Sequence, residues 1–196
     1  MKKQKSIDKK VVNIIIMIMT ISVVLLAIII AKPFSKAEES AIFFGSGTEK
    51  DPFLIESAKD LVTLANAINN NKSYGGNYYN DKYYKLVDDI DFKGVDNLEI
   101  IGRMKERVSS TEMNKYAFKG NFNGNGHVIK NVTYTISEVS ARERIGLFGE
   151  IYGDGENNGS VYNLTIDNMN IVLDSKSTGS YNAVTIGTIA GHLGQN

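Results

Sequence analysis

The chain has 196 residues, 42% of them hydrophobic and 22% charged, which fits a folded protein with a sizeable core and excludes a disordered chain. Seven of the 22 basic residues and one of the 22 acidic residues precede Glu38, so the remainder has 15 basic and 21 acidic side chains and is unsuited to bind nucleic acid. The absence of cysteine excludes disulfides, thiolate catalysis and cysteine-based metal sites.

The first 37 residues have the pattern of an export segment. A basic start precedes an uncharged apolar run from Val11 to Ala31, which as a helix is long enough to cross a bilayer core, and Pro33 then ends it. Small residues at Ser35 and Ala37 fit a signal-peptidase site. We therefore expect this segment either to be removed after Ala37 or to remain as a membrane anchor, with the rest of the chain exported to the cell surface or beyond.

One domain is expected over residues 45–196, after a linker at residues 38–44. Ser57, followed three residues later by Asp60, has the pattern of an N-cap with a capping-box acid. Apolar residues at helical spacing follow, namely Ala58, Leu61, Val62, Ala65 and Ile68, and predict a helix over residues 58–69. Its apolar stripe needs a partner surface, so we expect this helix to cover one open end of the domain.

Residues 69–81 are rich in Asn and Gly and are expected to form an irregular loop. This loop carries Tyr74, Tyr78 and Tyr79. Clustered tyrosines can form an aromatic platform for a sugar ligand, and they can equally pack over the neighbouring helix. The three tyrosines are therefore candidates for ligand binding, with packing as the alternative.

The densest group of carboxylates is Asp88, Asp89 and Asp91, between strands expected near residues 84–86 and 90–92. Such a group can bind calcium or act in acid–base chemistry. Three acids on alternating strand faces do not all converge on one ion, however. We expect these aspartates to hold a turn by accepting hydrogen bonds from backbone amides.

Two short motifs recur along the second half of the chain. Asn123-Gly124-Asn125-Gly126 predicts a tight turn before a strand in which Val132, Tyr134 and Ile136 face the core. Residues 127–134 (HVIKNVTY) align without gaps on residues 159–166 (GSVYNLTI), which gives Asn131 and Asn163 equivalent positions and suggests an internal asparagine ladder at a corner. The segment IGLFG (residues 145–149) is echoed by IGTIAG (residues 186–191), with glycines at Gly146, Gly149, Gly187 and Gly191. Interleaved repeats of this length indicate a solenoid.

The order of these segments over residues 44–194 resembles bacterial surface proteins with GLUG-type repeats. The resemblance rests on GSGTEKDPFLIESAKDLVTLANAIN, YYKLVDDIDF, IIG, FKGNFNGNGHVIKNVTY, IGLFG, VYNLTI and IGTIAG. It implies a right-handed parallel β-helix with an N-terminal capping helix, found in secreted adhesin-like proteins and ahead of other domains in large extracellular enzymes. The motif residues are structural, so the resemblance implies no chemistry. The chain departs from the pattern in the long polar stretch at residues 103–116.

The remaining polar motifs suggest structure more than chemistry. His127 and His192 each follow a glycine and are expected to be partly exposed turn residues, since no cysteine or His-Glu-x-x-His pattern accompanies them. Asn71, Asn131, Asn158 and Asn163 each begin an Asn-x-Ser/Thr sequon. No cofactor or metal site is expected.

The sequence thus predicts a non-catalytic extracellular module of adhesin type that binds a glycan or protein ligand or acts as a scaffold. Two alternatives stay open. The first is the leading region of a larger secreted enzyme such as a peptidase, and the second is a β-helical polysaccharide-acting enzyme. We also expect further coils to stack on residues 184–193, because this last repeat has no amphipathic segment to cover it.

Overall fold

The computed structural model describes residues 9–10, 13, 17–19, 42–103, 115–137, 142–153, 155, 158–173 and 183–195. The chain divides into two compact units, Met1–Glu39 and Ser40–Asn196. In the first unit the described residues are helical. No helix within the described part of the chain is long and apolar enough to span a bilayer. The rest of the predicted segment Val11 to Ala31, and the cleavage candidate Ala37, lie outside the described residues.

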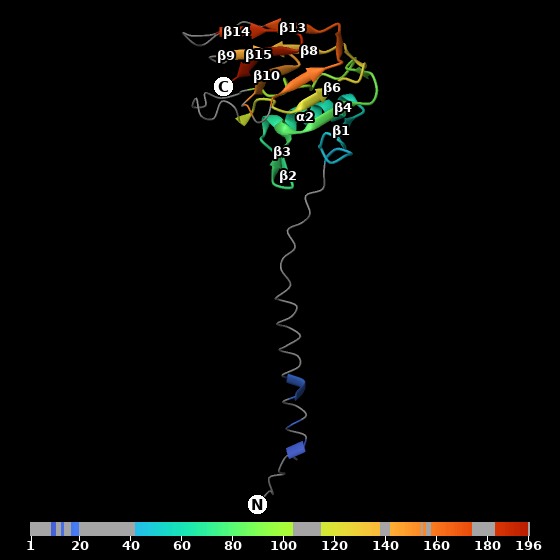
Figure 1. Cartoon of the computed structure of the whole chain (residues 1–196), viewed down its shortest axis with the longest axis vertical. Coiled ribbons are helices and arrows are strands. Elements are labelled where there is room, and N and C mark those ends of the chain that lie inside the picture. Colours follow the sequence, from blue (N-terminus) through green and yellow to red (C-terminus); the bar gives the residue numbers. More distant parts are fainter. Residues whose placement is uncertain are drawn as a thin grey trace, which may run out of the picture. The chain divides into compact units, whose positions relative to one another are not determined.

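The second unit is mainly β, with one α-helix among its described residues (Figure 1). Its elements are β1 (Phe53–Ile55), α2 (Ala58–Asn69), β2 (Ser73–Tyr74), β3 (Asn77–Tyr78), the 3-10 turn η1 (Tyr79–Asp81), β4 (Tyr83–Leu86), β5 (Ile90–Asp91), β6 (Asn121–Asn123), β7 (Val128–Lys130), β8 (Thr133–Ile136), β9 (Arg142–Ile145), β10 (Phe148–Gly153), β11 (Ser160–Tyr162), β12 (Thr165–Asp167), β13 (Asn170–Leu173), β14 (Ala183–Ile186) and β15 (Ala190–Gln195).

The helix α2 begins and ends where the sequence predicts. The Asp60 carboxylate accepts hydrogen bonds from the Ser57 hydroxyl at 2.8 Å and from the Glu56 amide at 3.1 Å, and Ser57 Oγ in turn accepts from the Asp60 amide at 3.4 Å. These bonds satisfy amides that a helix start otherwise leaves unpaired. The apolar stripe of the helix is buried in the core, through Leu61, Leu64, Ala65, Ala67 and Ile68.

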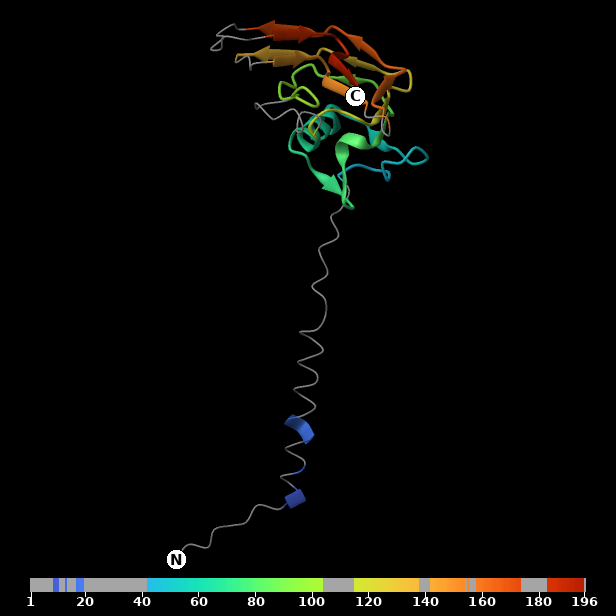
Figure 2. The ribbon, with the colours of Figure 1, turned by 60° about the vertical axis from the view of Figure 1, so that its left-hand side comes forward.

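Strands pair in parallel with strands that lie far along the chain. β6 to β10, which we call the middle layer, pair in order with β11 to β15, which we call the end layer. Side chains hydrogen-bonded between these layers are 37 to 42 residues apart. On the other side of the middle layer, β4 pairs with β6, β5 with β7, and β1 with β4. The end layer and α2 therefore lie at opposite ends of the domain (Figures 1 and 2).

The register of the end layer differs from the gapless repeat predicted above. Ser160 lies opposite Asn121 and Thr165 opposite Val128, so Asn163 falls beside Gly124 and not at the position equivalent to Asn131. The alignment is wrong because the corner after β6 holds more residues than the corner after β11. Asn163, where φ is 52°, lies at the corner that separates β11 from β12.

The strands around the IGLFG and IGTIAG segments pair with each other, with one inserted residue in the second segment. Ile145 pairs with Ile186 and Phe148 pairs with Ala190, so the IGTIAG motif has one residue more than IGLFG before its strand begins. Gly146 shows why glycine is needed at this corner. A Cβ at Gly146 would lie 2.6 Å from the Gly187 carbonyl oxygen of the next layer, and comparable backbone contacts surround Gly149, Gly187 and Gly191.

Aromatic rings form the core below the end layer. Phe53, Tyr84 and Phe122 occupy paired positions on β1, β4 and β6 and are fully buried. The rings of Tyr84 and Phe122 stack with centroids 6.4 Å apart. Phe43, which the sequence placed in the linker, is also buried and packs against Phe53 at 5.5 Å. The folded domain therefore begins before residue 45.

Candidate functional site

The predicted acidic turn is present between β4 and β5, and two of its carboxylates, those of Asp89 and Asp91, accept hydrogen bonds from the next layer. Asp89 accepts a hydrogen bond from the Val128 amide at 3.0 Å and contacts His127 Nδ1 at 3.2 Å. The bond from Val128, followed by that from His127, lowers the pKa of the Asp89 carboxyl below its ordinary value of 3.8. Asp88 accepts from the Asp89 amide. The expectation that these acids hold a turn is confirmed.

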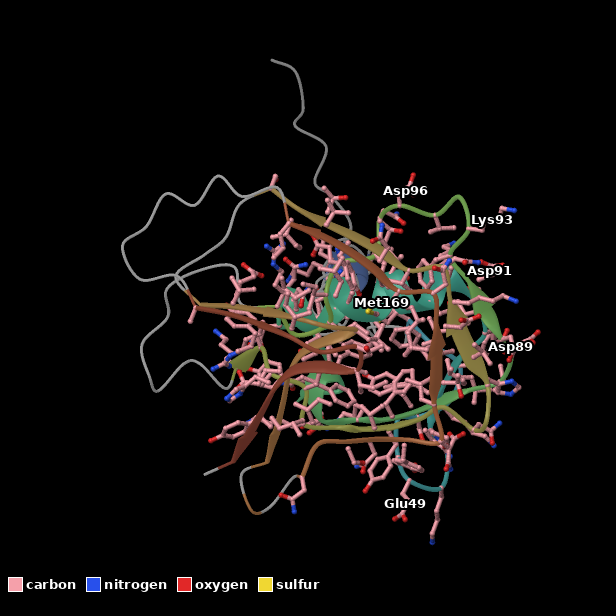
Figure 3. All side chains as sticks on the ribbon, turned by 90° about the horizontal axis from the view of Figure 1, so that it is seen from above. Glu49, Asp89, Asp91, Lys93, Asp96 and Met169 are labelled. Atoms are coloured by element: carbon pink, nitrogen blue, oxygen red, sulfur yellow. The ribbon has the colours of Figure 1, made fainter. Side chains whose placement is uncertain are left out.

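Asp91 begins a chain of side-chain hydrogen bonds that crosses three strands. Its Oδ1 accepts from Asn131 Nδ2 at 2.7 Å and from the Lys93 amide at 2.9 Å, and Asn131 Oδ1 accepts from Asn168 Nδ2 at 2.7 Å. The bond from Asn131, followed by that from Lys93, lowers the pKa of Asp91. Figure 3 shows Asp89, Asp91 and Lys93 along the same edge of the domain. We call Asp91, Asn131 and Asn168 the corner ladder.

The corner ladder corrects the asparagine ladder predicted from the sequence. Asn131 and Asn163 both lie at corners, as expected, and both have positive φ, but they do not stack on each other. Asn131 bonds with Asn168, while Asn163 Nδ2 lies 3.4 Å from Asn123 Oδ1. These bonds are on the exposed surface and not inside the domain. Among the described residues, no group of three or more His, Cys, Asp or Glu side chains is placed to hold a metal ion.

The turn before β7 has the predicted left-handed residues. Asn125 and Gly126 have φ of 54° and 83°, and the Asn125 amide donates to Asn123 Oδ1 at 2.8 Å. Gly124 has a different role, because a Cβ there would lie 2.4 Å from the Asn163 carbonyl oxygen. Glycine at Gly124 thus lets the end layer approach the middle layer.

Two groups of ion pairs around β9, β10 and β15 were not predicted from the sequence, and we call them together the ionic cluster. One joins Arg103 to Glu143, and the other joins Arg144 and His192 to Glu150. The Glu143 carboxylate is buried and lies 2.7 Å from Arg103 Nε. Glu150 is buried as well and contacts His192 Nδ1 at 3.2 Å through Oε1. Its Oε2 forms an ion pair with Arg144 Nη1, without an aligned hydrogen bond between those two atoms.

A sequence signal for this cluster exists. Glu143 is two residues from the buried Ile145, so the alternation of β9 places a carboxylate on the core face. His192 lies directly opposite Glu150 in the middle of β15. The expectation that His192 is a turn residue is therefore wrong, whereas His127 does lie in the turn before β7. A buried carboxylate needs such cationic partners because desolvation of an unpaired charge is costly.

The three candidate tyrosines do not share one surface. Tyr78 is exposed, whereas Tyr79 is buried among Phe43, Phe53 and neighbouring core residues. The side chain of Tyr74 lies outside the described part of the structure. The expected irregular loop also contains a short hairpin, in which β2 and β3 pair around Gly75 and Gly76 with φ of 58° and 82°. A Gly-Gly pair between strands is a known hairpin signal.

Comparison with known proteins gives one informative similarity. No family model matches the chain, and no solved structure matches it. Halomucin from Haloquadratum walsbyi (strain DSM 16790 / HBSQ001) is 32% identical over 159 residues, which cover 80% of this chain. The match covers 2% of the length of Halomucin, so the chain spans only a small part of this relative.

Proposed function

We propose that residues 40–196 form a right-handed parallel β-helix that acts as an exported, non-catalytic cell-surface module. The observation that carries this proposal is the parallel pairing of five successive strands with five others, 37 to 42 residues later. A chain that coils with a fixed repeat produces such pairing. The right hand follows from the resemblance to proteins with GLUG-type repeats.

The use of the polar side chains supports a structural role. Three polar side chains form hydrogen bonds with a neighbouring layer, namely those of Asp89, Asp91 and Asn131. These groups therefore hold the layers together. The basic and apolar start of the chain supports export. The similarity to a short stretch of Halomucin supports a module that serves as one part of larger proteins.

Treatment of intact cells with an external protease tests whether the domain lies outside the cell. The proposal expects the domain to be cleaved or released while a cytoplasmic control protein stays whole. Protection of the domain in intact cells, with cleavage after lysis, would contradict export.

Ligand binding by this module is tested by substitution of Tyr78, which is 48% exposed at the end of the β2–β3 hairpin. Exposed aromatic rings bind the apolar faces of sugars. We expect Tyr78→Ala to weaken binding on an array of purified polysaccharides by about tenfold, or about 1.4 kcal/mol. Tyr162→Ala is the matched control, since Tyr162 is 45% exposed on the end layer. An equal effect of both substitutions would contradict a site at Tyr78.

One observation favours a second candidate function, a polysaccharide-acting enzyme. The ionic cluster contains two carboxylates, Glu143 on β9 and Glu150 on β10, each beside an arginine, and two carboxylates that flank a sugar perform acid–base chemistry on glycosidic bonds. Both carboxylates are buried and paired, which favours the structural role. Release of new sugar ends from acidic polysaccharides, lost in Glu150→Gln, would instead establish the enzyme.

A further inference from the structure

The chain contains three Asn-Gly pairs, namely Asn123-Gly124, Asn125-Gly126 and Asn158-Gly159. In such a pair the backbone nitrogen of the glycine can attack the side-chain carbonyl carbon of the asparagine, because glycine has no side chain to block the approach. A bond forms between this nitrogen and Cγ, the bond from Cγ to Nδ2 breaks, and ammonia leaves with the proton of the glycine amide. Water then opens the succinimide ring to give aspartate or isoaspartate.

The reacting groups of Asn125-Gly126 are bonded to two different layers. The Gly126 amide, which would be the nucleophile, donates a hydrogen bond of 2.8 Å to the Asn163 carbonyl oxygen, at the corner between β11 and β12. The Asn125 Nδ2, which would be the leaving group, donates to the Leu86 carbonyl oxygen at the end of β4, at 3.2 Å. The stacked layers therefore hold the two groups apart, and these bonds must break before the ring can close.

The other two pairs differ in what holds them. The Gly124 amide donates to the Tyr162 carbonyl oxygen of β11 at 2.8 Å, so this pair also depends on the end layer. The Gly159 amide donates to the Tyr152 carbonyl oxygen at 3.1 Å, and Asn158 forms a β-bridge with Gly153. These last contacts lie within the connection between β10 and β11. The third pair is therefore an internal control whose protection does not require β11 and β12 to stay on the middle layer.

We propose that Asn125 is a site of spontaneous deamidation that the stacked layers keep unreacted, so that its modification records separation of the end layer from the middle layer. Isoaspartate at this position adds a carbon atom to the backbone of the corner between β6 and β7. Either product also replaces the donor to the Leu86 carbonyl by a carboxylate oxygen. A corner that has reacted therefore does not regain its native contacts. The proposal is independent of where the protein lies and of what it binds.

The test is the rate of deamidation in the purified full-length chain in mild detergent at mildly alkaline pH, followed by mass spectrometry of its peptides. We expect Asn125 to react at least about tenfold more slowly in the folded chain than in urea, because the native rate follows the fraction of molecules that open. Gly124→Ala places a Cβ 2.4 Å from the Asn163 carbonyl oxygen and so displaces the acceptor of the Gly126 amide. This variant should raise the rate at Asn125 by about tenfold and leave the rate at Asn158 unchanged.

Gly187→Ala is the matched control for this substitution. Its Cβ would lie 2.2 Å from the Ala190 carbonyl oxygen, an equally close contact that lies within one layer and at another corner, so the rate at Asn125 should not change. Circular dichroism checks that both variants fold. Equal acceleration at Asn125 by the two variants would overturn the proposal.

Hydrogen exchange at the Gly126 amide gives a second readout that needs no variant. We expect this amide to be protected in the folded wild-type chain, since it is bonded to the Asn163 carbonyl oxygen. Exchange as fast as in urea would contradict the proposal, and so would a folded wild-type chain in which Asn125 reacts as fast as in urea.

Discussion

The side-chain amide of Asn168 donates a hydrogen bond of 2.7 Å to the side-chain oxygen of Asn131, and both residues have a left-handed backbone, with φ of 52° and 61°. The two asparagines thus turn the same corner in successive layers and tie these layers together. Asparagine suits this position for two reasons: it tolerates positive φ, and its side chain carries both a hydrogen-bond donor and an acceptor.

Substitution of Asn131 tests both properties. Asn131→Ala loses the bonds to Asp91 and Asn168 and places at positive φ a residue that tolerates this conformation less well than asparagine, so we expect a loss of about 2 to 4 kcal/mol in the free energy of unfolding. Asn131→Gly loses the same bonds without the backbone strain and should lose less. Urea unfolding of both variants makes the comparison, and an alanine variant as stable as the glycine variant would rule out a strained corner.

Gly124 and Gly126 should respond differently to the same substitution. Gly124→Asn places a Cβ against the Asn163 carbonyl and should cost more than about 2 kcal/mol, as overpacking does. Gly126→Asn projects into open space with a backbone that asparagine tolerates, so it should cost less than about 1 kcal/mol. Thermal and urea unfolding measure both values. Equal losses of stability in the two variants would show that the close approach of the two layers at Gly124 does not exclude a side chain there.

Glu150→Ala should be among the most destabilising changes in the domain. The substitution leaves Arg144 and His192 beside a buried site without their carboxylate, and removal of one partner from a buried pair typically costs about 3 to 5 kcal/mol. Lys130→Ala removes an exposed pair with Asp91 at 4.0 Å and should cost below about 1 kcal/mol. The free energy of unfolding in urea distinguishes them, and a similar small loss in both would mean that the Glu150 cluster is solvated.

Acid should weaken the corner between β4 and β5. The pKa values of Asp89 and Asp91 are lowered in the folded chain, so their bonds stabilise the domain fully above the ordinary value of 3.8 and lose this contribution as the pH falls through the lower folded values. The measurement is the free energy of unfolding from about pH 6 downward. In the double variant Asp89→Asn with Asp91→Asn, the decline below about pH 4 should be shallower; an unchanged slope would locate the acid sensitivity elsewhere.

Tyr134→Phe should leave stability unchanged or raise it. The Tyr134 hydroxyl is buried, burial raises its pKa, and no hydrogen-bond partner for it lies among the described residues. Removing an unpaired buried hydroxyl removes its desolvation cost. Tyr84→Phe is the control, since the Tyr84 hydroxyl donates to the Tyr79 carbonyl and its loss should cost about 1 kcal/mol. A comparable loss in Tyr134→Phe would indicate a bound water.

Local signals in the sequence predicted local structure well. The capping box at Ser57 and Asp60, the turn at Asn125 and Gly126, and the buried face of β8 all depend on residues a few positions apart. The layer register did not follow from the repeat, because corners of unequal length shift the alignment between strands. The ionic cluster was also missed, since its carboxylates meet their partners only after distant segments pair. Arg103 and Glu143, for example, are 40 residues apart.

The parallel pairing of the layers has a mechanical consequence. A pull between residue 42 and the end layer acts across stacked layers, each joined to the next by strand hydrogen bonds and corner side chains. Among the described strands, those of the end layer pair on one side only, so this layer should separate before the middle layer. At about 3.4 Å per extended residue, each layer that unravels lengthens the chain by about 130 Å. A domain built in this way yields to tension in steps and absorbs work at each one.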